Sequence, residues 1–102
     1  NYVELLRTAH SDWLAAGRTG DALPYAFPVD RARRRLDRID ARLGQYSYDT
    51  CTPIAPGTWE SVCWATQTAL SALELVKGGE HAFALTRPPG HHAGRDYMGG
   101  YS

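Results

Sequence analysis

The sequence HAFALTRPPGHHAGRDYMGGYS, residues 81–102, is the part of the chain that best indicates its fold class. Residues 81–86 form a short apolar run on both faces of an extended chain, which predicts an inner strand covered on both sides. Pro88, Pro89 and Gly90 then turn the chain out of that strand. A helix, a glycine turn, a strand and a loop in this order predict an α/β fold with a parallel sheet flanked by helices. In such sheets ligands gather beyond the carboxyl ends of the strands.

The residues before this strand predict a long amphipathic helix. Thr58 is a suitable N-cap, Glu60 lies in the first turn, and Lys77 precedes a Gly78-Gly79 stop. One side of this helix is apolar or small, and we expect it to be buried. It carries Trp59, Val62, Cys63, Thr66, Leu70, Leu73 and Val76.

Residues 2–16 predict a second amphipathic helix, which ends at Gly17. Its apolar positions are Tyr2, Leu5, Leu6, Ala9, Trp13 and Ala16. Farther along, residues 30–42 are rich in arginine with aspartate interleaved. Because this stretch contains no aromatic residue for base stacking, we interpret it as a solvated, salt-bridged helix or loop rather than a nucleic-acid arm.

Composition excludes several classes of protein. The 102 residues include 11 Lys+Arg and 11 Asp+Glu, so the zero net charge favours neither nucleic acid nor an anionic membrane as a partner. No apolar run approaches the ~20 residues that cross a bilayer. The two cysteines, Cys51 and Cys63, are too few for a disulfide scaffold. We therefore interpret them as free thiols of a cytoplasmic protein.

One convincing inner strand cannot complete a parallel sheet between helices. Three tryptophans, six tyrosines and two amphipathic helices would then have too little to pack against. We therefore expect residues 1–102 to be the amino-terminal portion of a single larger domain.

The adjacent histidines His91 and His92 are the candidate catalytic groups. Each imidazole titrates near neutral pH and shifts the pKa of the other, so one can stay protonated while the other moves protons. A His-His pair by itself is more often a surface feature or a chance metal-binding pair. Its position in Arg-Pro-Pro-Gly-His-His-Ala, after a buried strand, favours catalysis.

Residues 87–93 resemble the tandem-histidine signature of the histone deacetylase superfamily, which has the arginase–deacetylase fold. The continuation to Tyr101 is more similar to the acetylpolyamine amidohydrolase branch, as is the acidic loop leading into a helix at residues 48–60. The resemblance implies a zinc-dependent amidohydrolase. In such an enzyme a zinc-bound water attacks an acetamide carbonyl and releases acetate and a free amine.

The same resemblance implies a role for each matching residue. His92 would be the general base that deprotonates the water and later protonates the leaving amine, and His91 would stay protonated to stabilise the oxyanion. Gly100 would offer its carbonyl to the substrate amide, and Tyr101 would form a wall of the substrate tunnel. Asp49 would hydrogen-bond the substrate backbone or a distal amine.

The resemblance places the Zn²⁺ ligands, an Asp-x-His pair and a later Asp, after Ser102, together with a carbonyl-polarising tyrosine. No metal ligand is therefore assigned within this chain. A zinc site made of Cys51, Cys63, His91 and His92 is disfavoured, because their spacing fits no closed structural site.

Several hypotheses about function stay open. The substrate is either an acetylated polyamine or similar small acylated amine, or an acetyl-lysine in a protein. The chain is a non-catalytic interaction module if it is a separate gene product. An arginase-like hydrolase is disfavoured, because that branch lacks the Pro-Pro-Gly-His-His pattern. Dimers are common in the acetylpolyamine branch, so a homodimeric parent is a further expectation, with contacts sought in residues 20–44.

Overall fold

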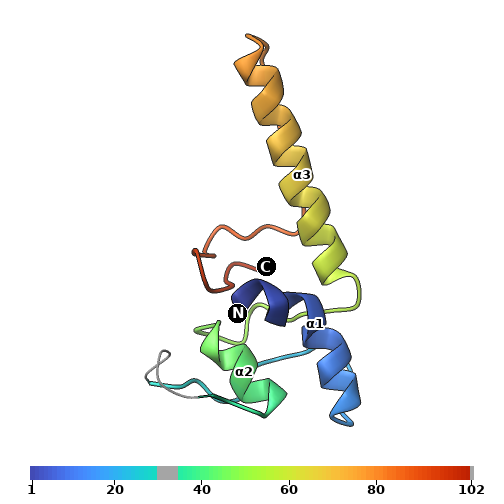
Figure 1. Cartoon of the computed structure of the whole chain (residues 1–102), viewed down its shortest axis with the longest axis vertical. Helices are drawn as coiled ribbons and strands as arrows, with labels where there is room; N and C mark the ends of the chain where they lie inside the picture. The colour runs from blue at the N-terminus through green and yellow to red at the C-terminus, as the bar shows by residue number, and fades with distance from the viewer. Residues whose placement is uncertain (30–34, 102) are drawn as a thin grey trace.

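The computed structural model describes residues 1–29 and 35–101. Its helices are α1 (Tyr2–Ala15), α2 (Ile39–Gln45) and α3 (Thr58–Lys77). Figure 1 shows α1 and α2 side by side at one end of the molecule, with α3 projecting away from them. This projection makes the molecule elongated, with extents of 48 × 28 × 20 Å.

Helix α1 forms where the sequence predicts it. The Asn1 side chain caps its first turn by accepting a hydrogen bond from the Glu4 amide at 2.9 Å. Gly17 follows the end of the helix with a φ of 75°, a left-handed conformation that glycine adopts easily. The predicted apolar stripe is confirmed at four positions that are buried: Leu5, Leu6, Ala9 and Trp13.

Helix α2 confirms the salt-bridge interpretation for the described part of the arginine-rich stretch; residues 30–34 lie outside the described residues. Arg38 donates two hydrogen bonds to the Asp40 carboxylate, at 3.1 and 2.7 Å. Arg42 donates to Asp12 of α1 at 3.2 Å. Because the hydrogen bonds and charge of Arg38, with the nearby Arg18, stabilise the carboxylate, the pKa of Asp40 lies below its ordinary value.

One hydrophobic core joins α1, α2 and three non-helical segments. An antiparallel bridge pairs Ala22 with Ile54, and their amides and carbonyls exchange hydrogen bonds of 2.9 and 3.0 Å. Met98 brings the C-terminal segment into this core with 1% of its surface exposed. The buried members are Leu5, Leu6, Ala9, Trp13, Ala22, Ile39, Leu43, Ile54 and Met98.

Helix α3 has the predicted bounds, but two expectations about it are wrong. Its N-cap is Gly57, with a φ of 83°, and the Thr58 hydroxyl instead accepts a hydrogen bond from the Ala55 amide at 3.0 Å. No residue of α3 is buried, and Leu70 and Leu73 are 49% and 47% exposed. An apolar helix face is buried only where another element packs on it. Trp59 in the first turn packs against the core and is partly buried, whereas within the described ranges no element covers Leu70 and Leu73.

The predicted strand at residues 81–86 runs without regular secondary structure. Phe83 and Leu85 are 85% and 82% exposed. A strand belongs to a sheet through hydrogen bonds to a neighbouring strand, and in the described part of the chain this segment has none. The expected parallel sheet is therefore not formed among these residues. None of the described helices has the length and hydropathy needed to cross a membrane.

Candidate functional site

The tandem histidines lie in a tightly folded segment after residue 87. The Ala93 amide donates to the Gly90 carbonyl at 2.9 Å, and the Gly94 amide donates to the Tyr97 carbonyl at 3.0 Å. The ring centroids of His91 and His92 are 4.1 Å apart, with 48° between the ring planes. The two imidazoles are therefore held next to each other.

Gly100 and Tyr101 lie close to the two histidines. Gly100 has a φ of 71°, and a Cβ there would lie 2.8 Å from the His92 amide nitrogen and 2.9 Å from His91 Nδ1. Only glycine fits this position without displacing the histidines. Tyr101 also has a positive φ, of 78°, and its ring centroid lies 6.1 Å from that of His91. The backbone conformation thus places the Gly100 backbone and the Tyr101 ring next to the imidazoles.

Asp49 lies in a loop that its own hydrogen bonds hold in place. Its carboxylate Oδ1 accepts from the Cys51 amide at 2.9 Å, and its carbonyl accepts from the Ser47 hydroxyl at 2.9 Å. Ser47 is buried, so the loop is anchored to the body of the molecule on that side. This arrangement limits the movement of the carboxylate.

A cavity of about 120 Å³ brings these groups together. It is lined by Asp49, Cys51, His91, His92, Gly100 and Tyr101. Every site residue predicted from the sequence therefore lines the same cavity, although their chemical roles stay predictions. Cys51 is the member that sequence analysis interpreted only as a free thiol. Cys51 lies only two residues after Asp49 in the chain, and this proximity could have predicted its place in the cavity.

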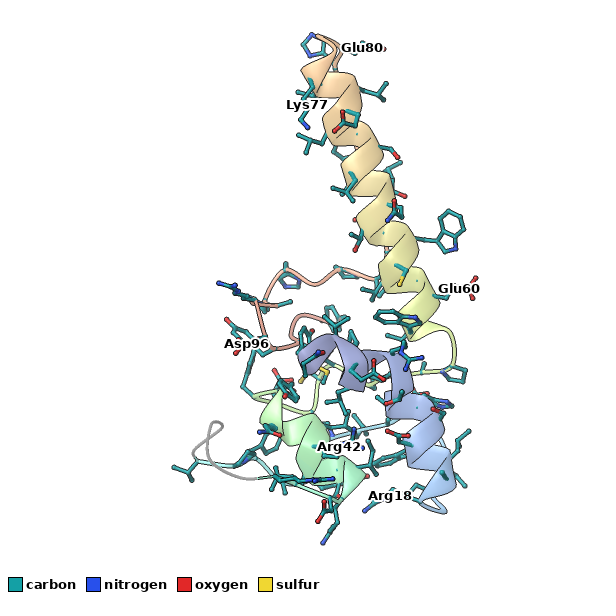
Figure 2. The ribbon with its side chains drawn as sticks, viewed as in Figure 1. Arg18, Arg42, Glu60, Lys77, Glu80 and Asp96 are labelled. Carbon is teal, nitrogen blue, oxygen red and sulfur yellow. The ribbon has the colours of Figure 1, made fainter. Side chains whose placement is uncertain are left out.

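The C-terminal segment reaches this position because it is tied to α1 and to the Asp49 loop. Figure 2 shows Asp96 beside the start of α1, far from Lys77 and Glu80 at the tip of α3. The pKa of Tyr2 is raised, mainly by partial burial and to a smaller extent by the negative charge of Asp96. The Met98 amide donates to the Tyr46 carbonyl at 2.8 Å, next to the loop that carries Asp49.

The described residues do not form a metal site by themselves. No group of three or more His, Cys, Asp and Glu side chains within residues 1–29 and 35–101 could hold a metal ion. Both cysteines are free thiols, as predicted.

The family model for the histone deacetylase domain matches residues 1–102. The chain belongs to the histone deacetylase family. Acetylpolyamine amidohydrolase 2 of Pseudomonas aeruginosa is 50% identical over 102 residues, and acetylpolyamine amidohydrolase of Mycoplana ramosa is 42% identical over 102 residues. Each alignment covers 98% of this chain and 30% of the relative. The resemblance to the acetylpolyamine amidohydrolase branch is thereby confirmed.

A solved structure confirms the fold class within this family. The crystal structure of acetylpolyamine aminohydrolase from Burkholderia pseudomallei matches with a TM-score of 0.87 and 34% identity. The match covers 98% of this chain and 30% of that one. The chain thus has the architecture of part of the arginase–deacetylase fold, and it spans about 30% of the length of these relatives.

Proposed function

We propose that the protein hydrolyses acetylated polyamines or similar small acylated amines to acetate and a free amine. The observation that carries this proposal is the cavity in which the tandem histidines, Asp49, Gly100 and Tyr101 meet. The relatives named as acetylpolyamine amidohydrolases support the choice of substrate class. Residues 1–102 would be the amino-terminal portion of the single domain that performs this reaction.

The two histidines would share the proton chemistry. His92 accepts a proton from the attacking water and later delivers it to the leaving amine, while protonated His91 stabilises the negative charge on the oxyanion. The ring centroids are 4.1 Å apart, so both imidazoles can reach the same substrate group. A positioned general base contributes roughly 10²- to 10⁴-fold to the rate.

The other cavity residues would hold the substrate. The Gly100 carbonyl accepts a hydrogen bond from the substrate amide N–H, and the Tyr101 ring forms a wall along the alkyl chain. Asp49 binds the distal cationic amine of a polyamine, because a fixed carboxylate at the cavity complements a positive charge.

The metal belongs to the same proposal. Zn²⁺ is the expected cofactor, and an Asp-x-His pair and a later Asp after Ser102 would bind it. The carbonyl-polarising tyrosine would also follow Ser102.

The exposed apolar residues support the assignment of the chain to a larger domain. Phe83 is 85% exposed and Val76 is 52% exposed, although both have the side chains of a protein core. We test this by reading the coding sequence beyond Ser102. An open frame that supplies the Asp-x-His pair and the later Asp supports the enzyme, and a stop codon there supports the interaction module.

The reaction is tested in the full-length protein loaded with zinc. Replacing both His91 and His92 by alanine should abolish hydrolysis of N-acetylputrescine, and unchanged hydrolysis would contradict the proposal. Comparing N-acetylputrescine with an acetyl-lysine peptide distinguishes the two substrate hypotheses. A cytoplasmic location, and a homodimer with contacts in residues 20–44, belong to the proposal as well. Chromatography with light scattering tests the dimer.

A further inference from the structure

We propose that Tyr48 is a positioning residue, whose ring holds the Asp49 loop against the tandem-histidine segment and so sets the width of the cavity. The inference rests on the proposed function. It adds a residue that lines no part of the cavity itself.

The first contact that carries the inference is between Tyr48 and Gly99. A Cβ on Gly99 would lie 2.6 Å from the Tyr48 hydroxyl oxygen and 2.9 Å from the Tyr48 Cε1 atom. The tyrosine ring therefore occupies the space that a larger residue at position 99 would need. The same Cβ would lie 2.9 Å from the His92 carbonyl oxygen, so the ring edge, Gly99 and the histidine backbone are packed together.

The second contact is between two aromatic rings. The Tyr48 and Tyr97 ring centroids are 6.0 Å apart and the planes meet at 73°, an edge-to-face arrangement that aromatic pairs favour. The hydrogen bond from the Met98 amide to the Tyr46 carbonyl, 2.8 Å long, joins the same two segments beside it. Each of the residues 97, 98 and 99 thus contacts either Tyr46 or Tyr48.

This junction lies next to both walls of the cavity. Asp49 follows Tyr48 in the chain, Gly100 follows Gly99, and both of these following residues line the cavity. A change in the Tyr48 contact therefore changes the distance from the Asp49 carboxylate to the histidines. A displacement of about 1 Å can lower a reaction rate by about 10²-fold.

Packing rather than the hydroxyl carries this role. The edge-to-face contact with Tyr97 is made by the ring of Tyr48, and phenylalanine has the same ring. We therefore expect the Tyr48→Phe variant to keep the contact and the activity.

The experiment measures kcat and KM for N-acetylputrescine in the full-length, zinc-loaded protein. Tyr48→Leu should lower kcat about tenfold and change KM less than about threefold, because Asp49 still binds the distal amine but holds the acetamide out of line with the histidines. Tyr48→Phe should stay within about twofold of the parent protein. The matched control is Tyr25→Leu, which removes a ring stacked on Trp13 at 6.1 Å, outside the cavity. It should keep kcat within about twofold.

Three outcomes overturn the inference: an unchanged kcat for Tyr48→Leu, an equal loss for Tyr48→Phe, or an equal loss for Tyr25→Leu. An inactive parent protein would instead contradict the proposed function. If Tyr48→Leu does not fold, Gly99→Ala combined with Tyr48→Phe tests the contact from its other side. Gly99→Ala alone should lower kcat, and adding Tyr48→Phe should restore part of it, because it removes the hydroxyl oxygen nearest the new Cβ. An unchanged loss in the double variant would overturn the inference.

Discussion

Single residues decide how the candidate site is built. Gly100 and Gly17 have nearly the same backbone conformation, with φ values of 71° and 75°. They differ in their surroundings: a Cβ on Gly17 meets nothing within 4 Å, whereas one on Gly100 meets His91 and His92. Comparing substitutions at Gly17 and Gly100 therefore distinguishes the effect of backbone strain from the effect of displacing the histidines.

Gly100→Ala should lower kcat/KM about 10²-fold, because the added methyl group displaces the His92 backbone and the His91 ring. Gly17→Ala is the control. It should introduce the same backbone strain, about 1 kcal/mol, with activity within twofold of the parent protein. Steady-state kinetics and urea unfolding measure the two effects. Equal activities for the two variants would show that Gly100 does not position the histidines.

Secondary-structure elements decide the stability of the body that holds the site. Helices α1 and α2 bury their apolar faces against each other, and the core they share includes Met98 of the histidine segment. Asp40, with 1% of its surface exposed, lies between Arg18 and Arg38 at the outer end of this pair. The site thus depends on packing that begins well away from the histidines.

Leu43→Ala should destabilise the protein by about 2–5 kcal/mol, because Leu43 is fully buried and its removal leaves a cavity in the core. Leu14→Ala changes the same residue type at a position that is 50% exposed, and should have a much smaller effect. Urea unfolding measures both free energies. A loss at Leu14 as large as that at Leu43 would show that the core lies elsewhere.

Asp40→Asn tests the pH dependence of the α2 region. Because the pKa of Asp40 is lower in the folded protein, its carboxylate adds stability above the ordinary value of 3.8, and this stability is lost as the pH falls through the folded value. The variant should lose about 2 kcal/mol of unfolding free energy at neutral pH. Its stability should also fall less steeply than that of the parent protein as the pH is lowered. Asp37→Asn, at a side chain 91% exposed, should behave as the parent protein. Thermal unfolding between neutral and acidic pH measures this, and parallel curves for Asp40→Asn and the parent protein would contradict it.

At the scale of the whole molecule, the described residues include many large apolar side chains that are exposed. Half of these side chains belong to the segment 81–86 and to helix α3, which projects from the body of the molecule (Figure 1). Phe83 and Leu85 are 85% and 82% exposed. We expect the rest of the proposed domain to cover this surface.

The chain of residues 1–102 alone should therefore associate in solution, bind zinc weakly and lack deacetylase activity. Leu73→Gln should reduce its association but destabilise the full-length protein by about 2–5 kcal/mol, because the side chain would be buried there. Ser71→Gln, at an exposed polar position of the same helix, is the control. Light scattering and urea unfolding measure the two effects. A full-length protein indifferent to Leu73→Gln would contradict burial of this face.

Local sequence patterns were enough to predict several helix ends and the identity of the chemical groups. The start of α1 at Tyr2, its stop at Gly17 and the end of α3 at Lys77 depend on contacts within a few residues. The histidine pair was recognisable for the same reason, since its motif is continuous in the chain.

Only the tertiary structure decided which surfaces are buried and how the cavity is closed. The same kind of apolar stripe is buried in α1 and exposed in α3, because burial depends on a neighbouring element and not on the stripe itself. Likewise, Cys51 lines the cavity and Tyr48 packs on Gly99 through contacts between segments about 50 positions apart in the chain. Such contacts follow from the folding of the whole chain, and no local pattern encodes them.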